Sequence, residues 1–367
     1  MATLIDWVRK KFHPPPEVGS HFLRAGLTQR GYSKTHYTLI KSRYESTMFS
    51  YKNVSDRTKH ISTVRLQEEA GKELKFPVKM QPNLVRLINW TNPKYPMNVK
   101  FVLENKEICV FVKKLTVLVV VNSATNHYDR KQAIRKTWAN DTHYAHLGTA
   151  RVLFLLGRSV NPSVQIRVEK EFKEYGDILQ GDFIDGYLNL TFKGVMCYKW
   201  LTERCRNAKM ILKSDDDLLV NMFVYFRKLD ELLPSTNVYC EFQRSVIFRN
   251  KRNKWYVSKN HFRGETFYDR YCTGKFVSMK NDIIPSLYIS ATKTPFFPYD
   301  HVLLFGYVMG NVQGLGYETI GKKNFDFNNN MAMKCLKDHK NKCSKFIMSA
   351  CAEEMEVTWF TILKYFR

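Results

Sequence analysis

The stretch MILKSDDD, residues 210–217, decides the fold, because a short apolar run ending in three carboxylates predicts a buried strand with an ion site at its tip. Adjacent carboxylates repel one another and lose hydration on burial unless a cation offsets their charge. Oxygen ligands suit hard divalent ions such as Mg²⁺ or Mn²⁺, which commonly hold a diphosphate with one or two protein carboxylates. The favoured interpretation is chemistry on a nucleotide-activated substrate, and the alternative is a solvated acidic turn.

The segments around this strand alternate between apolar runs and helical periodicity. Strands are predicted at 115–121, 151–156, 177–179, 209–213 and 237–242, and helices at 131–138, 164–175, 190–205 and 222–233. Such alternation predicts an α/β fold with a largely parallel sheet covered by helices on both faces. Ligands of such sheets bind beyond the carboxyl ends of the strands, where Asp215–Asp217 stand. The glycine-rich segment 310–316 lacks GxGxxG spacing and is predicted to be a loop.

Composition bounds the function. The chain has 367 residues, 44% of them hydrophobic, which is enough for a large core in one big domain or two smaller ones. Its 58 Lys and Arg against 34 Asp and Glu give a net charge of +24. This charge favours anionic partners such as nucleotide diphosphates, acidic glycans or membrane surfaces. Because the basic residues are scattered, we predict no nucleic-acid partner, and only a folded basic face would offer that alternative.

The eight cysteines include no CxxC pair, so the usual zinc and thioredoxin signatures are missing. Cys335, Cys343 and Cys351 are evenly spaced, which permits a zinc site, disulfides in a lumenal protein, or free thiols in a cytosolic one. Cys197 and Cys205 are predicted to share a helix. Eight helical residues separate them by ~12 Å, which is too far for a mutual disulfide.

Two kinds of sequence feature give opposite indications about passage through the secretory pathway. No stretch approaches the ~20 apolar residues of a membrane span, and residues 1–16 lack an apolar core of signal-peptide length. Taken alone, this predicts a soluble protein. N-x-S/T sequons favour a secretory route. The candidate glycosylation sites are Asn53, Asn89, Asn140 and Asn189.

Further sequence blocks surround the acidic stretch. They are RKQAIRKTW (130–138), VLFLLG (152–157), EYGDILQ (174–180), DFIDGYLNLTFK (182–193), KSDDDLLVN (213–221), KWYVS (254–258) and YCTGKFVS (271–278). Over about residues 115–310 the chain resembles the β-1,3-galactosyltransferase-like hexosyltransferases of glycosyltransferase family 31. Several blocks in one order are far more specific than the aspartates alone.

The resemblance implies a Rossmann-like GT-A fold with a mixed, mostly parallel sheet. It also implies a UDP-sugar donor, Mn²⁺ or Mg²⁺, a glycan acceptor on protein or lipid, and transfer of galactose or N-acetylhexosamine with inversion in a β-1,3 linkage. The implied domains are a stem or irregular region at 1–110, a GT-A catalytic domain at 111–325, and a cysteine-containing extension packed on it at 326–367. Family members are usually anchored in the Golgi membrane with a lumenal catalytic domain. We expect the same location and membrane association here, although no anchor is visible.

The resemblance also assigns roles to residues. It assigns the metal to Asp217 and Asp215, the donor to Asn122, Ser123, Arg135, Asp215 and Asp216, and the acceptor to Trp255, Tyr256 and Gly274. For Arg135 the alternative is a structural salt bridge. Trp255 and Tyr256 would otherwise simply pack.

One departure from the family concerns the base that takes the acceptor's proton. The family supplies it from an acidic pair before valine, and here the matching stretch is YDHV, residues 299–302. His301 therefore stands at the position of the base, and Asp300 at the first acidic position. Histidine is a competent general base near neutral pH. The alternative is a catalytically weak member that binds a glycan or a partner transferase.

Overall fold

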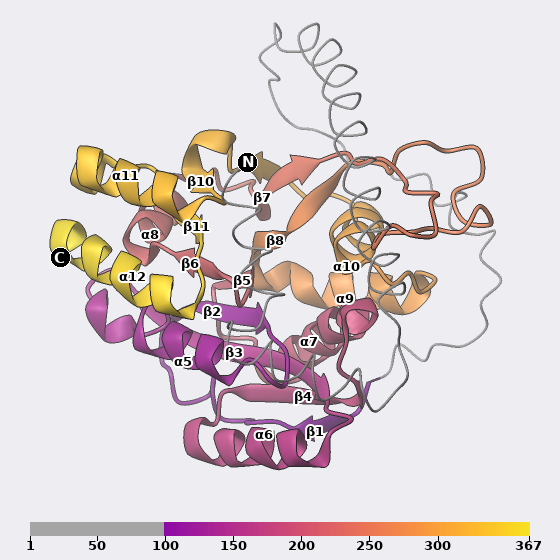
Figure 1. Cartoon of the computed structure of the whole chain (residues 1–367), viewed down its shortest axis with the longest axis horizontal. Helices are drawn as coiled ribbons and strands as arrows, with labels where there is room; N and C mark the ends of the chain where they lie inside the picture. The colour runs from indigo at the N-terminus through magenta and orange to yellow at the C-terminus, as the bar shows by residue number, and fades with distance from the viewer. Residues whose placement is uncertain (1–98) are drawn as a thin grey trace, which may run out of the picture. The chain divides into compact units, whose positions relative to one another are not determined.

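An eight-stranded sheet forms the centre of the computed structural model, which describes residues 99–367 (Figure 1). The strand order is β1-β4-β3-β2-β5-β8-β7-β9. The strands are β1 (Phe101–Leu103), β2 (Leu115–Asn122), β3 (Thr149–Arg158), β4 (Ile178–Ile184), β5 (Met210–Asp215), β7 (Val238–Gln243), β8 (Tyr271–Lys280) and β9 (Tyr317–Thr319).

Strand directions place the acidic stretch at one edge of the sheet. Strands β4, β3, β2 and β5 run parallel to one another, whereas β1 is antiparallel to β4, and β8 is antiparallel to both β5 and β7. In the parallel register Asn122 of β2 lies opposite Asp215 of β5. The carboxyl ends of these strands therefore meet, and the predicted α/β class with a mixed, mostly parallel GT-A type sheet is confirmed.

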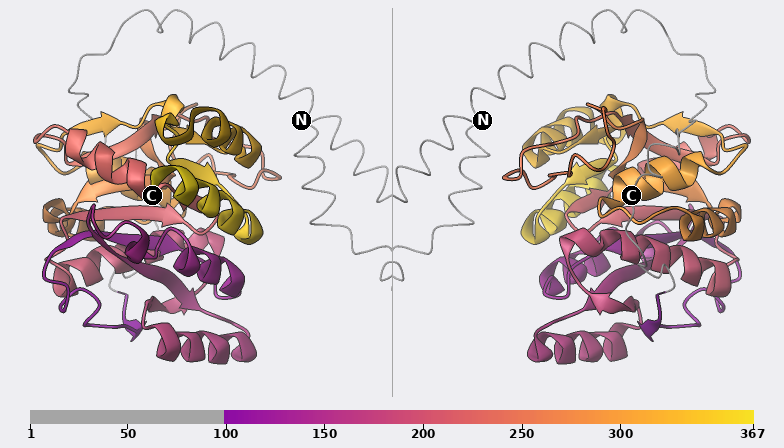
Figure 2. Two further views of the ribbon diagram at one scale, coloured as in Figure 1. Left: turned by 90° about the vertical axis from the view of Figure 1, so that its left-hand side faces the viewer. Right: turned by 90° about the vertical axis from the view of Figure 1, so that its right-hand side faces the viewer.

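Helices cover both faces of the sheet (Figures 1 and 2). In β2, Leu118 and Val120 enter the core formed with one set of helices, whereas Val117 and Val119 enter the core on the opposite face. This two-sided burial explains the continuous run of branched apolar residues. The first set contains α7 (Leu190–Arg204) and α9 (Ile284–Lys293), and the second contains α5 (Tyr128–Lys136), α8 (Met222–Glu231) and α12 (Ala352–Phe366).

The predicted helix at 164–175 is α6 (Pro162–Tyr175), which ends at Gly176 in the left-handed region. Gly176 has φ of 65°, a conformation in which glycine has no Cβ penalty. The segment 311–316 is a loop, as predicted. Within residues 99–367 no helix has both the length and the apolar character needed to cross a membrane.

The C-terminal residues hold the segment that follows the acidic stretch. Strand β6 (Leu218–Val220) begins directly after Asp217 and pairs with β11 (Ile347–Ser349), which also pairs with β10 (Phe325–Asp326). The backbone carbonyl of Asp217 accepts a hydrogen bond from the Ala350 amide at 3.0 Å. Helix α12 and α11 (Asn329–His339), like β8, have no counterpart in the sequence prediction.

Three disulfides join segments that are separate in the chain. The pairs are Cys109–Cys205, Cys240–Cys272 and Cys335–Cys343, while Cys197 is buried and free and Cys351 is exposed and free. The prediction that Cys197 and Cys205 do not pair is confirmed. Among the alternatives at the evenly spaced cysteines, the structure has a disulfide between the first two and a free thiol at the third.

Replacing both Cys109 and Cys205 with alanine should lower the free energy of unfolding by about 2–5 kcal/mol, because this disulfide closes a loop of 96 residues in the unfolded chain. Denaturant titration would measure the loss. Cys351→Ser is the control, because it removes a free thiol, keeps a side-chain acceptor at the N-cap of α12 and should leave the midpoint nearly unchanged. Equal midpoints for the double variant and the parent protein would contradict the prediction.

Candidate active site

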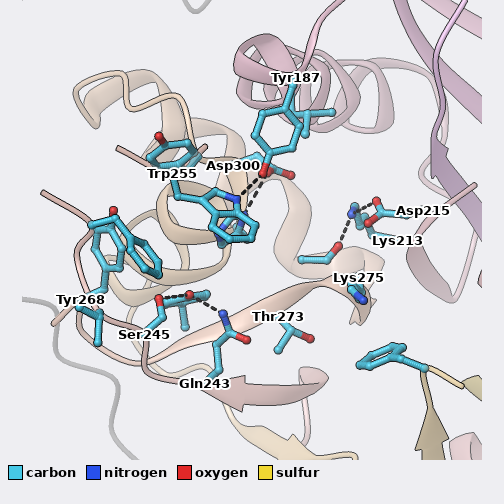
Figure 3. A pocket seen from close by; sticks show the side chains of 18 residues that line it. Tyr187, Lys213, Asp215, Gln243, Ser245, Trp255, Tyr268, Thr273, Lys275 and Asp300 are labelled. Atoms are coloured by element: carbon cyan, nitrogen blue, oxygen red, sulfur yellow. Dashed lines mark hydrogen bonds and ion pairs between the residues drawn. The ribbon is translucent and has the colours of Figure 1, made fainter. Parts of the chain in front are cut away.

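A pocket of about 520 Å³ lies at the carboxyl end of β5 (Figure 3). Its walls come from β5, the first residues of β8, the short helix α10 (Asp300–Val302) and the loop 244–270 between β7 and β8. Of the predicted site residues, it brings together Asp215, Asp300, His301, Trp255 and Gly274. Further lining residues are Tyr187, Lys213, Gln243, Ser245, Phe248, Tyr271, Lys275, Tyr299 and Phe327.

A lysine lies beside the first aspartate of the acidic stretch. The ammonium of Lys213 is 2.5 Å from Oδ1 of Asp215 and also donates to the carbonyl of Gly274. Burial raises the pKa of Asp215 to about 6, against the opposing attraction of Lys213. The side chain of Lys213 is only 7% exposed, so its charge is held at the base of the pocket.

The other acidic group of the pocket is Asp300, which is paired with His301. Nδ1 of His301 lies 3.4 Å from Oδ1 of Asp300. Burial alone would raise the pKa of Asp300, but the hydrogen bond from His301 and the charge of Lys213 outweigh it and hold the pKa below its usual range. Asp300 is therefore ionised at neutral pH and favours the tautomer of His301 with its proton on Nδ1. The lone pair on Nε2 is then available as a proton acceptor.

Gly274 lets strand β8 pass close to this histidine. A Cβ atom at position 274 would lie 2.8 Å from Cβ of His301. Any larger residue would have to displace the imidazole or the strand. The acceptor-side role predicted for Gly274 is untested, but its position shows that it sets the place of His301.

Aromatic rings form the outer wall of the pocket. The indole nitrogen of Trp255 donates to the hydroxyl of Tyr187 at 2.7 Å, and the Trp255 side chain is 42% exposed. The ring of Phe248 packs beside Trp255 at 5.8 Å. Tyr256 does not line the pocket, and its carbonyl accepts a hydrogen bond from Tyr299 at 2.9 Å.

The second aspartate of the stretch points into a buried network. Oδ2 of Asp216 accepts from Ser123 and contacts Nδ1 of His127, both at 2.7 Å, and Oδ1 accepts from Arg130 at 2.9 Å. Burial opposes ionisation, but these partners lower the pKa of Asp216 below its ordinary value. Asp216 and Ser123, both predicted at the donor, are thus bonded to each other outside the pocket lining. Asn122 lines a separate cavity of about 20 Å³ that also touches Lys213 and Asp300.

Arg135 lies in an ion-pair cluster and not at the pocket. Its guanidinium binds both carboxylate oxygens of Asp177 at 2.7 Å and Glu171 at 2.8 Å. It also stacks on Tyr175, 4.1 Å from the ring centre. The structure therefore has the salt bridge that was the alternative to nucleotide contact.

The remaining predicted residues lie at the surface or outside the described part. Asp217 is exposed and stands two residues after the pocket residue Asp215 in the chain. Asn140 accepts from Thr142, and Asn189 donates to the carbonyl of Ile184. Asn53 and Asn89 lie outside the described residues. Glycosylation at all four positions stays a prediction.

Two carboxylates of the stretch, Asp215 and Asp217, have the chemistry of a hard-ion site. In residues 99–367 no group of three His, Cys, Asp or Glu side chains is placed to hold a metal. Mg²⁺ and Mn²⁺ do not require three protein ligands, because these ions commonly bind one or two carboxylates together with water and substrate phosphates. Asp216 does not fit as a ligand, since Ser123, His127 and Arg130 already engage its oxygens.

Several pocket residues were given no role from the sequence, although most of them stand in the blocks quoted above. Tyr271, for example, is held by Ser245 at 2.6 Å and by Gln243. The loops that bring them together contain no periodic pattern. Lys213 is different, because a lysine two residues before the first aspartate of the stretch is visible as a potential charge partner. The residues missed in this way are Tyr187, Lys213, Gln243, Ser245, Tyr271, Lys275 and Tyr299.

Comparison with known proteins identifies the family to which this protein belongs. The pattern that defines the galactosyltransferase family matches residues 129–314, about half of the chain, and the chain belongs to this family. It is 31% identical over 210 residues to beta-1,3-galactosyltransferase 1 of Homo sapiens, covering 56% of this chain and 63% of that protein.

A second relative is named for the transfer of a different sugar. Acetylgalactosaminyl-O-glycosyl-glycoprotein beta-1,3-N-acetylglucosaminyltransferase of Homo sapiens is 33% identical over 201 residues, covering 52% of each chain. The matched region thus spans about half to two thirds of these relatives. A solved glycosyltransferase involved in glycosylation of the major capsid of PBCV-1 aligns with 66% of this chain and 99% of its own, at 13% identity and a TM-score of 0.35.

Replacing Arg135 with glutamine should lower the free energy of unfolding by roughly 3–5 kcal/mol, because Asp177 and Glu171 would lose the guanidinium that offsets their burial. Thermal and denaturant unfolding would measure this. Arg151→Gln is the matched control, since its ion pair with Asp141 is more exposed and should contribute no more than ~1 kcal/mol. Intact stability together with lost UDP affinity would instead assign Arg135 to the donor.

Proposed function

We propose that the protein is a metal-dependent inverting hexosyltransferase that moves galactose or N-acetylhexosamine from a UDP-sugar to a glycan in a β-1,3 linkage. The observation that carries this proposal is that one pocket contains two separate pairs of charged or ionisable side chains. Asp215 lies beside the buried cation Lys213, while Asp300 forms a separate pair with His301. Family membership, and the activities for which the two relatives are named, support the choice of sugars and linkage.

Asp215 and Asp217 would hold the Mn²⁺ or Mg²⁺ ion. When bound, such an ion offsets the negative charge that develops on a departing diphosphate. Lys213 contributes a fixed positive charge to the same end of the pocket, and its two tethers keep it in place. Preorganised charge of this kind needs no rearrangement during reaction.

His301 is the proposed base. The acceptor oxygen forms a bond to the anomeric carbon as the bond from that carbon to the UDP oxygen breaks. The hydroxyl proton passes to Nε2 of His301, while ionised Asp300 fixes the tautomer and stabilises the imidazolium that results. Attack from the side opposite the leaving group inverts the anomeric centre.

The aromatic wall is the proposed acceptor platform. Trp255 is half exposed at the pocket and its indole is fixed by the hydrogen bond to Tyr187. A large flat ring held in one orientation buries the apolar face of a sugar at low entropic cost. The acceptor is proposed to be a glycan on protein or lipid.

The three disulfides support a lumenal setting, because such bonds persist in oxidising compartments. Together with the sequons and family membership, they support the Golgi lumen as the proposed location. Membrane association belongs to the same proposal and rests on the family alone.

A second candidate is a catalytically weak family member that binds a glycan or a partner transferase. The specific observation in its favour is that a histidine stands where the family has a carboxylate. The two candidates differ in whether donor is consumed when acceptor is present.

The metal and donor assignment predicts that Asp217→Ala abolishes Mn²⁺-dependent UDP binding and UDP release from a panel of UDP-sugars with a glycan acceptor. The fold should survive, because Asp217 contacts Ala350 through its backbone carbonyl and not its side chain. Calorimetry and UDP detection would measure both effects. Asp230→Ala, at an exposed position of α8, is the matched control. Unchanged affinity for UDP with Mn²⁺ in the Asp217 variant would overturn the assignment.

The base assignment predicts a change in the pH–rate profile. His301→Asp exchanges one kind of base for another, so the acidic limb of the pH–rate profile should move relative to that of the parent protein. His301→Ala should lose most turnover, about 10²-fold or more, and keep donor affinity. Full turnover in His301→Ala would move the role to Asp300. Activity only in His301→Asp would show that the parent chain is the catalytically weak member.

A further inference from the structure

The loop 244–270, which forms the outer wall of the pocket, is strongly basic. It contains eight Lys and Arg residues against two Asp and Glu. The whole chain is also basic, but here the excess is concentrated in 27 residues beside a substrate pocket. A charge of this sign near a cleft raises the local concentration of anionic ligands.

The basic loop has a defined shape. The guanidinium of Arg249 donates to the carbonyls of Ser258, His261 and Phe262 at 2.6–2.9 Å, which ties the loop to itself. The disulfide Cys240–Cys272 joins the two strands at its base. The backbone of the loop is therefore held in one shape beside the pocket, and such preorganisation lowers the cost of binding a ligand.

Lys254 is the basic residue placed at the aromatic wall. Its ammonium lies 4.0 Å from the centre of the Tyr187 ring and 5.7 Å from that of Trp255, and both rings line the pocket. Within residues 99–367 no carboxylate lies within ion-pair distance of it. The contact with the ring face holds the ammonium in place and leaves its N–H donors without an anionic partner.

A second exposed lysine lies at the other end of the pocket. Lys275 follows Gly274, whose carbonyl accepts from Lys213 beside Asp215 (Figure 3). This end belongs to the proposed diphosphate site, so Lys275 is explained by the donor. Lys254 is at the proposed acceptor platform, where a neutral glycan would not explain it.

We propose that the acceptor is an acidic glycan, and that Lys254 binds its carboxylate or sulfate while a sugar face lies on Trp255. This inference rests on the proposed transferase function, which supplies the acceptor role of the pocket. Loss of a hydrogen bond to a charged group predicts about a tenfold loss of affinity. Because Lys254 is exposed, salt should weaken the preference.

Binding to the full chain tests this with lactose, 6′-sulfolactose and 6′-sialyllactose, which share one neutral core. We expect at least one acidic form to bind about tenfold more tightly than lactose at low salt, with the preference reduced at 1 M salt. Tighter binding of 6′-sulfolactose would indicate a sulfate ligand, and tighter binding of 6′-sialyllactose would indicate a carboxylate ligand. Equal affinity for all three sugars would overturn the proposal.

Single-residue variants distinguish an anion site at Lys254 from a general effect of the positive charge of the basic loop. Lys254→Gln should abolish the preference and Lys254→Arg should retain it. Neither lysine lines the pocket, but Lys254 contacts the rings of Tyr187 and Trp255, which do. Lys259→Gln removes the same charge from another exposed position of the basic loop and should leave the preference intact. An equal loss in the Lys254→Gln and Lys259→Gln variants would overturn the proposal. Charge-selective binding without UDP release from any UDP-sugar would count against the transferase function and leave the anion site standing.

Discussion

The ammonium of Lys213 is the fixed charge on which the pocket depends. It ties Asp215 of β5 to the carbonyl of Gly274 in β8 and lowers the cost of ionising both Asp215 and Asp300. An antiparallel strand beside the last parallel one makes this link possible, because β8 brings its first residues to the carboxyl end of β5. Without this cation, burial would raise the pKa of Asp215 further, and Asp300 would depend on His301 for its stabilisation.

The three adjacent aspartates have three different environments. Asp215 faces the pocket, Asp216 enters a network with Ser123, His127 and Arg130, and Asp217 is exposed. Like charges at neighbouring positions are tolerated because each has a different way to be stabilised. The middle residue, Asp216, joins the start of α5 to the end of β5 through His127 and Arg130.

Two loops complete the pocket from opposite sides. Tyr187 comes from the connection between β4 and α7, and Trp255 from the basic loop between β7 and β8. Their hydrogen bond and the contact of Lys254 with Tyr187 link the two loops. Charge and aromatic surface are thus combined at the same wall of the pocket.

Local pattern determined most strands and helices between residues 115 and 242, although it missed the short strand β6, and the sequence blocks indicated the family. The ion site at the end of β5 stays a prediction. Burial on two faces and helical spacing leave a trace in neighbouring residues, which is why these elements could be predicted. The contacts of Arg135 and the separation of Asp216 from the pocket came only from the tertiary structure. So did Lys213 and the Tyr187–Trp255 wall, because each depends on residues more than 60 positions apart or on the direction of a side chain.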